Sequence, residues 1–109
     1  MTYVKINGIL YSAKINGNTK DINWDGRMNK SITLEMSISD AVSLFTDGLV
    51  WSIVMDITQE DGTTSQQEYD NSDYCLAGDI TDHRDGTITA KMGKYTDLEL
   101  ALLAIAQEV

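Results

Sequence analysis

The sequence predicts an α+β fold, in which an antiparallel β-sheet built from hairpins carries one short internal helix and a C-terminal helix packed on the sheet. Six of the eight glycines follow Asn or Asp, a pairing that suits tight hairpin turns because both residues tolerate positive φ. Between these pairs, apolar and polar residues mostly alternate, as in a half-buried strand. Apolar residues at helical spacing follow residue 96. The length of 109 residues favours a single domain over residues 1–109.

The expected strands follow one another between the Asx-Gly pairs. They cover residues 3–6, 9–15, 31–37, 49–57, 74–80 and 87–92. Asn7-Gly8 joins the first two as a hairpin, and the repeat of Lys-Ile-Asn-Gly at Asn16-Gly17 predicts a second turn of a meander. Residues 18–30 and 59–73 are expected to be loops.

Two helices are expected besides the strands. Residues 39–45 form the short one, which a Ser cap starts and Asp47-Gly48 stops. Thr96 is followed three residues later by Glu99, which is a capping box. The second helix therefore begins there and runs to the C-terminus.

The C-terminal helix is apolar around its circumference, since Glu99 is the only polar residue between positions 98 and 106. One stripe, expected to dock on the sheet, consists of Leu98, Ala101, Leu102, Ile105 and Val109. Leu100, Leu103 and Ala104 lie off that stripe. Because a small domain covers both sides of a helix poorly, these three residues are the candidate interface with a second copy or another protein chain.

The negative charge is concentrated in one segment. Residues 56–85 hold nine acids and one base, Arg84, out of a net charge of −9 for the chain. The candidate acidic surface consists of Asp70, Asp73, Asp79, Asp82 and Asp85. A field of this sign argues against nucleic acid as a partner. The acids lack the spacing of an EF-hand, so Asp82 and Asp85 are expected to shape a turn and not to bind a metal.

Signatures of catalysis are missing from the sequence. His83 and Cys75 are the single residues of their types and cannot together supply a zinc site. There is no glycine-rich phosphate loop, and nothing marks two carboxylates for a shared cleft. We therefore expect no enzyme and no cofactor. The longest apolar runs are about nine residues, half of a membrane span, so no membrane partner is expected.

Trp24 and Arg27 form the candidate recognition loop. Trp24 lies in the polar segment Asn23-Trp24-Asp25-Gly26-Arg27, where a turn does not require an aromatic residue. Loop tryptophans serve recognition or fold back as lids over the edge of a core, and the lid is the favoured interpretation here.

Several segments resemble small proteins encoded in prophage structural gene clusters (tail and minor structural genes) of gut-dwelling, low-GC Gram-positive bacteria. The segments that carry the resemblance are residues 4–8, 24–27, 31–36, 51–54, 68–74 and 77–86 running into 91–93. The likeness spans most of the chain and implies a phage setting, an assembly or accessory role, and no particular catalytic or binding residue.

Three functions follow as expectations, in order of preference. The first is a non-enzymatic phage structural or accessory protein, tail or baseplate associated, that self-associates or binds phage structural proteins. Such a protein would be found in the cytoplasm of the bacterial host and in the virion. The second is an acidic inhibitor that mimics nucleic acid against a basic host protein. The third is a carbohydrate-binding module built around Trp24 and the tyrosines.

Overall fold

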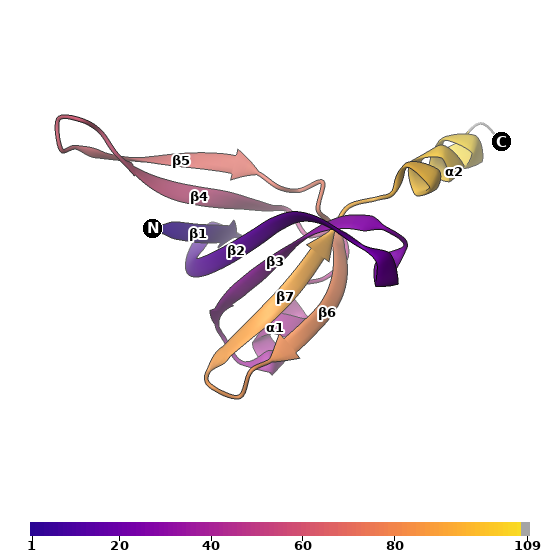
Figure 1. The fold of residues 1–109 in the computed structure, drawn as a ribbon, viewed down its shortest axis with the longest axis horizontal. Helices are drawn as coiled ribbons and strands as arrows, with labels where there is room; N and C mark the ends of the chain where they lie inside the picture. Colours follow the sequence, from indigo (N-terminus) through magenta and orange to yellow (C-terminus); the bar gives the residue numbers. More distant parts are fainter. Residues whose placement is uncertain (108–109) are drawn as a thin grey trace.

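The α+β class is confirmed by the computed structural model, which describes residues 1–107 apart from the side chains of residues 18, 19 and 107. The strands are Thr2–Ile6 (β1), Ile9–Asp21 (β2), Arg27–Glu35 (β3), Trp51–Thr58 (β4), Thr64–Asp70 (β5), Leu76–Asp82 (β6) and Thr87–Gly93 (β7). The helices are Ile38–Leu44 (α1) and Asp97–Gln107 (α2), with a 3-10 turn at Ile22–Trp24 (η1). In this part of the chain the strands form one antiparallel sheet in the order β5-β4-β1-β2-β3-β7-β6 (Figure 1).

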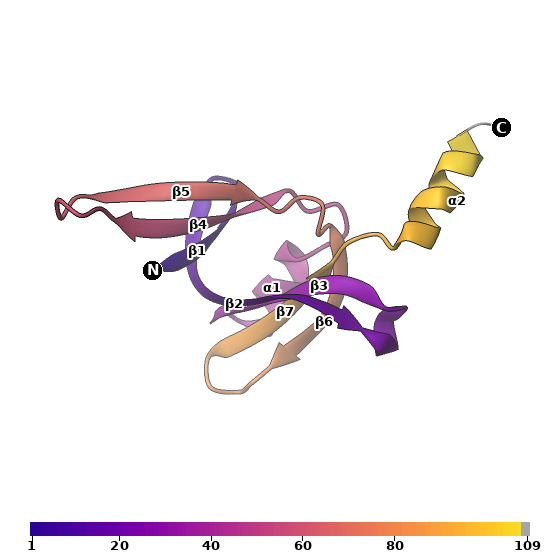
Figure 2. The ribbon, with the colours of Figure 1, turned by 45° about the horizontal axis from the view of Figure 1, so that its top comes forward.

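Strand β2 is shared between two halves of the sheet. Its residues 9–12 pair with β1, and from Ala13 onward it pairs with β3. Asn16-Gly17 was expected to be a turn, but the chain continues through it as a strand. The register instead shifts between Asn16 and Thr19, and such a bulge increases the local twist. Figure 2 shows β2 passing from the β1–β4–β5 half to the β3–β7–β6 half.

The hydrophobic core lies on one face of this sheet, beneath α1. Its buried residues come from β1, β3, β4, β7, α1 with its C-cap, and the segment before β6: Val4, Ile6, Ile32, Leu34, Ala41, Phe45, Trp51, Tyr74, Ile88, Ala90 and Met92. The indole Nε1 of Trp51 donates a hydrogen bond of 2.9 Å to the carbonyl of Tyr74, which satisfies the polar atom of the largest core residue. Ser37, not Ser39, caps α1, because its hydroxyl accepts from the amide of Asp40.

The two segments expected to be loops are mostly strand. Residues 18–30 contain the end of β2, η1 and the start of β3, and residues 59–73 contain β5. Asp61-Gly62 turns the chain between β4 and β5, with Gly62 at φ 86°. Every residue of β5 is exposed, so this strand has no apolar alternation to reveal it.

The expectation that the C-terminal helix packs on the sheet is wrong. Helix α2 projects away from the sheet (Figures 1 and 2), and residues 100–106 are all exposed. The β4–β5 hairpin projects toward the opposite end. These two arms raise the Cα radius of gyration to 15.8 Å, whereas a compact chain of this length has about 13 Å.

Candidate functional site

The start of α2 is fixed by its own residues. The amide of Thr96 donates to the Glu99 carboxylate over 2.8 Å, and the amide of Glu99 donates to the Thr96 hydroxyl over 3.2 Å. These reciprocal bonds are the capping box that the sequence predicts. They satisfy two of the amides that a helix start leaves without partners.

Arg27 ties this capped end to the sheet. Its Nη1 and Nη2 donate to the two oxygens of Glu99 over 2.5 and 3.0 Å, and Nη1 also donates to the carbonyl of Lys94 over 3.0 Å. A bidentate guanidinium–carboxylate pair fixes direction as well as distance. Because Lys94 belongs to the linker after β7, Arg27 holds both the linker and the first turn of α2.

Each residue of the Arg27–Glu99 pair shifts the pKa of the other toward the charged form. The Arg27 hydrogen bonds lower the pKa of Glu99 from 4.5 to about 2, with the Thr96 amide as the next cause. The hydrogen bond to Glu99 in turn raises the pKa of Arg27. The Arg27 side chain is only 5% exposed, and its Nε has no hydrogen-bond partner among residues 1–107. Arg27 therefore opens β3 and positions α2, which corrects the expectation that it belongs to an exposed recognition loop.

Trp24 lies half-buried against the sheet, as the lid interpretation expects. The Arg27 guanidinium carbon stands 4.9 Å from its ring centre, a cation–π contact. A Cβ on Gly93 would lie 2.8 Å from the Trp24 ring and 2.5 Å from Arg27 Cδ, and one on Gly78 would lie 2.9 Å from the ring. Only glycine at these two positions lets Trp24 lie so close to the strands. Beside the ring is a small hollow of about 330 Å³.

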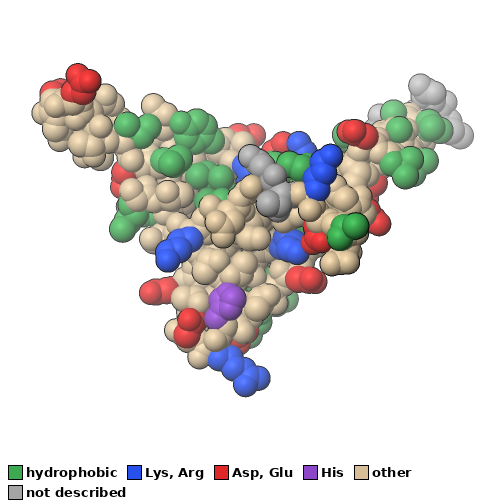
Figure 3. All heavy atoms as spheres, viewed as in Figure 1, with side chains coloured by type: hydrophobic (Ala, Val, Ile, Leu, Met, Phe, Trp, Pro, Cys, Tyr) green, Lys and Arg blue, Asp and Glu red, His purple; other side chains and the backbone are tan. Residues whose placement is uncertain are grey.

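The outer surface of α2 is an uncovered apolar patch. The candidate interface residues Leu100, Leu103 and Ala104 are exposed there, but so is the stripe that was expected to face the sheet. The large side chains and their exposed fractions are Leu98 70%, Leu100 52%, Leu102 57%, Leu103 45% and Ile105 60%. Figure 3 shows hydrophobic side chains exposed on the projecting helix. Val109, also placed on the stripe, lies outside the described residues.

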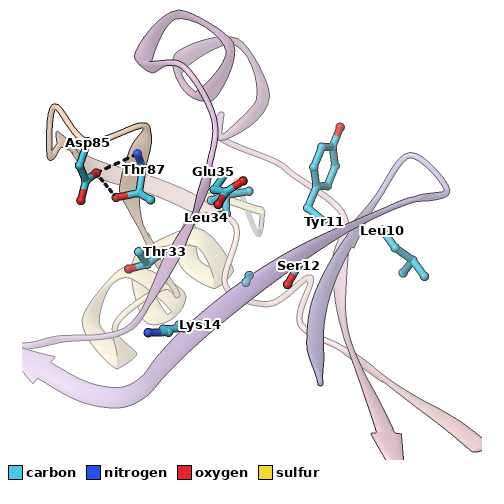
Figure 4. Close-up of a pocket in the computed structure, with 10 residues that line it drawn as sticks. Leu10, Tyr11, Ser12, Lys14, Thr33, Leu34, Glu35, Asp85 and Thr87 are labelled. Carbon is cyan, nitrogen blue, oxygen red and sulfur yellow. Dashed lines mark hydrogen bonds between the residues drawn. The ribbon is translucent and has the colours of Figure 1, made fainter.

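Two hollows lie beside β2, one on each side of the point where it changes partners. The Glu35 hollow, of about 760 Å³, lies between β2, β3 and the start of β7 and contains Lys14, Thr33, Glu35 and Asp85. Figure 4 shows Asp85 bonded to Thr87, whose amide and hydroxyl donate over 3.0 and 2.5 Å. Asp85 therefore serves its own turn.

The second hollow, the Met55 hollow, is of about 720 Å³ and more apolar. Its walls are Met1, Thr2, Ser12, Ala13, Lys14, Ile15, Asn16, Ile53 and Met55. It exists because β1 stops pairing at Ser12, which leaves the β1 side of β2 without a strand partner from Ala13 onward among the described residues. Hydrophobic side chains gather on this side of the molecule over β1, β4 and β5 (Figure 3).

The candidate acidic residues lie on separate elements. Asp70 ends β5 and accepts from the amide and hydroxyl of Ser72, which lower its pKa. Asp82 accepts from the amide of Arg84, and Asp85 from Thr87, so both shape the β6–β7 turn as predicted. Asp73 is exposed before β6, and Asp79 is exposed on β6. The five acids are thus spread over the end of β5, the segment before β6, strand β6 and the β6–β7 turn.

His83 and Cys75 do not form a reactive pair. The Nε2 of His83 lies 2.7 Å from the hydroxyl of Thr89, across the β6–β7 turn, while Cys75 is half-buried before β6. Among residues 1–107, no three His, Cys, Asp or Glu side chains are grouped so that they could hold a metal ion. Within the same residues, no helix has the length and apolar character needed to cross a membrane.

No family model, curated protein sequence or solved structure matches this chain. Its site is therefore argued from its own geometry.

Sequence reasoning missed the link between Arg27 and Glu99, which are 72 positions apart. In the sequence, the capping box already explains Glu99, and the turn at Asp25-Gly26 already explains a polar residue at Arg27. Neither residue therefore indicated a distant partner, although the two form an ion pair in the structure. The one available signal was Glu99 itself, the only polar residue between positions 98 and 106, whose charge a distant cation could balance.

Proposed function

We propose that this chain is a non-enzymatic structural or accessory protein that works by docking its C-terminal helix on another protein chain. One observation carries the proposal: α2 is apolar on all sides, uncovered by its own sheet, and yet held at its start by Arg27 and Glu99. A frayed terminus needs no such anchor. Burial of apolar surface on a partner stabilises the complex by about 25 cal/mol per Å².

Other classes of partner fit the chain less well. A net charge of −9 repels the phosphates of nucleic acid. The first turn of α2 carries Asp97 and Glu99, and its last turn carries no base. Helices that lie on anionic membranes are rich in Lys and Arg on their polar face. A protein surface is the partner that remains compatible with an apolar helix bearing only acids.

The phage setting of the proposal rests on the resemblance to prophage structural-cluster proteins. In that setting the chain is made in the host cytoplasm, docks on its own copies or on tail or baseplate proteins, and enters the virion with them. A nucleic-acid mimic needs its acids in a row, whereas Asp70 and Asp85 stand on different hairpins. A carbohydrate module needs a free aromatic face, whereas Trp24 is covered by Arg27 and the glycine strands.

The experiment is sedimentation velocity over a range of concentrations. The test variant is Leu102→Gln with Ile105→Gln, since glutamine keeps helix propensity while it removes apolar surface. Val50→Gln is the matched control, because Val50 is an exposed aliphatic residue in the segment before β4. We expect the wild type and the control to associate, and the helix variant to associate at least about tenfold more weakly.

A wild type that stays monomeric at every concentration would contradict self-association. A helix variant that associates as well as the wild type would contradict the role of α2. The second pair, Leu100→Gln with Leu103→Gln, tells which side of the helix is in contact.

A further inference from the structure

We propose that strand β5 pairs antiparallel with β5 of a second copy of this chain, so that the two sheets join into one across a two-fold axis. This contact is separate from the α2 contact of the proposed function and uses the opposite arm of the molecule (Figures 1 and 2). Strand β5 is one of the two edges of the sheet, and no strand among residues 1–107 pairs with its outer side. The backbone donors and acceptors of such an edge are a template for a strand of another chain.

The backbone groups that face outward belong to alternate residues of β5. The amide of Asn71 donates to the carbonyl of Trp51 over 2.9 Å, and the register of β4 with β5 is unbroken from there to Thr64. Because antiparallel hydrogen bonds alternate along a strand, the odd-numbered residues of β5 bond to β4. The even-numbered residues therefore direct their amides and carbonyls away from the sheet.

The other edge strand, β6, is protected, whereas β5 is not. The amide of Ala77 on β6 donates to the side chain of Asp47 over 2.8 Å, and the register of β6 with β7 shifts between Ala77 and Ile80. A covering loop and a bulge both hinder the addition of a further strand. Strand β5 keeps a regular register, contains no Lys or Pro, and is exposed on both faces. It is therefore open to pairing along its full length.

The sequence of β5 favours a second copy as the partner strand. Gln67 is the middle one of its 7 residues, so pairing centred on Gln67 is the one two-fold register that matches the whole strand. In this register Glu68 faces Gln66 of the second copy, and Asp70 faces Thr64. Each acid thus lies opposite an amide or a hydroxyl, and the destabilising placement of like charges directly across the strands is avoided. The same pairs bring the outward backbone groups together, since all four residues are even-numbered.

Charge limits this contact and gives it a recognisable salt dependence. The two Glu68 side chains would lie diagonally across the junction, but each accepts a hydrogen bond of 3.1 Å from Lys5 of its own copy. Each chain carries a net charge of −9, so repulsion between whole molecules opposes pairing at low ionic strength. Salt screens this repulsion. The pairing should therefore strengthen as salt is added.

The test uses chains that carry Leu102→Gln with Ile105→Gln, so that the outcome does not depend on α2, and Cys75→Ala, which removes the one native thiol. Far-UV circular dichroism and thermal melting establish that each variant is folded. In this background, dimers linked by a disulfide are measured after equilibration in a glutathione redox buffer.

The thiol is introduced at two positions of β5. Gln67→Cys places it on the proposed axis, where the two Cα atoms of a non-hydrogen-bonded pair lie about 4.5 Å apart, within the range of a disulfide. Ser65→Cys is the matched control, because Ser65 is also exposed and odd-numbered but faces Tyr69 of the second copy. Its two thiols would be separated by four residues along the strand, roughly 13 Å.

We expect the yield of linked dimer to be at least about tenfold higher for Gln67→Cys than for Ser65→Cys, and to rise between about 0.05 and 0.5 M sodium chloride. Equal yields at the two positions would overturn the pairing of β5 with its own copy. A yield that falls as salt is added would overturn it as well, because charge attraction would then hold the dimer.

A second pair of variants tests the role of the backbone. Gln66→Pro, added to Gln67→Cys, removes an outward amide and leaves the bonds to β4 in place, the one arrangement in which an edge strand tolerates proline. Gln66→Ala is its matched control, because it loses the same side chain and keeps the amide. We expect the proline chain to fall to the dimer yield of Ser65→Cys and the alanine chain to keep the yield of Gln67→Cys. A folded proline chain that still dimerises fully would overturn pairing through the backbone.

Discussion

Arg27 is a buried cation whose side-chain hydrogen bonds hold the start of α2 and the linker before it. Its guanidinium joins the Glu99 carboxylate, the Lys94 carbonyl and the Trp24 ring. Removing one partner of such a pair leaves an uncompensated buried charge. A buried cation thus positions a helix that does not pack on the hydrophobic core.

The acid dependence of this pair follows from the pKa of Glu99, which the Arg27 hydrogen bonds lower from 4.5 to about 2. A carboxyl whose folded pKa is depressed contributes stability that is complete above its unfolded pKa. That contribution declines below about pH 4.5 and is gone once the pH has fallen through 2. We expect the side-chain carboxyl ¹³C resonance of Glu99 to titrate near pH 2 and the α2 amide resonances to shift with it. In Glu99→Gln, the α2 amides should not follow this titration. A Glu99 midpoint near 4.5 would show that Arg27 does not hold the carboxylate in solution.

Gly93 makes the Trp24 and Arg27 contacts possible by its lack of a side chain. A Cβ there would lie 2.5 Å from Arg27 Cδ and 2.8 Å from the Trp24 ring, so both groups must move. We expect Gly93→Ala to lower the free energy of unfolding by about 1–3 kcal/mol, the usual cost of overpacking. Urea denaturation followed by tryptophan fluorescence measures it.

The matched control is Gly17→Ala. The three heavy atoms nearest to its Cβ would be side-chain carbons of Lys30, the first at 3.2 Å, which can give way. That variant should change stability by less than about 0.5 kcal/mol. Equal losses in the two variants would mean that the Trp24–Arg27 contact does not constrain position 93.

At the scale of the elements, strands β3 and β7 are paired on both sides, whereas β5 is an exposed edge strand. Local opening is easiest where few apolar contacts hold the backbone. We expect native-state hydrogen exchange to rank the strands accordingly, with the amides of Ile32 and Ala90 slowest and those of β5 many times faster. Uniform protection across β3, β7 and β5 would contradict an independently opening β4–β5 hairpin.

The sequence predicts those elements well whose local pattern and tertiary role agree. The hairpin at Asn7-Gly8, the strand at residues 31–35 and the Thr96–Glu99 capping box are examples. Strand β5 has no apolar alternation because both of its faces are exposed, so only Asp61-Gly62 indicated a hairpin. Asn16-Gly17 carries a turn signal, but pairing with β3 overrides it.

The position of helix α2 was the hardest feature to predict from the sequence, for a different reason. An apolar stripe predicts that a helix will be covered, but it does not predict whether its own chain or another chain covers it. The answer depends on the direction of the linker, and Arg27, 72 positions away from Glu99, sets that direction. The candidate site was therefore found in part: Leu100, Leu103 and Ala104 are exposed, but so are the residues assigned to the sheet.

At the scale of the whole molecule, the two arms give the chain a shape that solution scattering can test. The principal extents are 55 × 36 × 25 Å, and the Cα radius of gyration is 15.8 Å. A helix folded back on the sheet would reduce that radius toward the roughly 13 Å of a compact chain of this length. The Arg27–Glu99 pair opposes that movement, because the helix cannot fold back without separating the two charges.

We therefore expect small-angle X-ray scattering of the wild type, extrapolated to zero concentration, to give a radius near 16 Å rather than 13 Å. Association would raise the radius with concentration, so the extrapolation separates the shape of one chain from its assembly. Arg27→Met, which cannot hold Glu99, is the comparison. Its helix is free to cover its apolar side chains on its own sheet, and its radius should fall. An equal radius in both chains would show that residues other than Arg27 direct α2 away from the sheet.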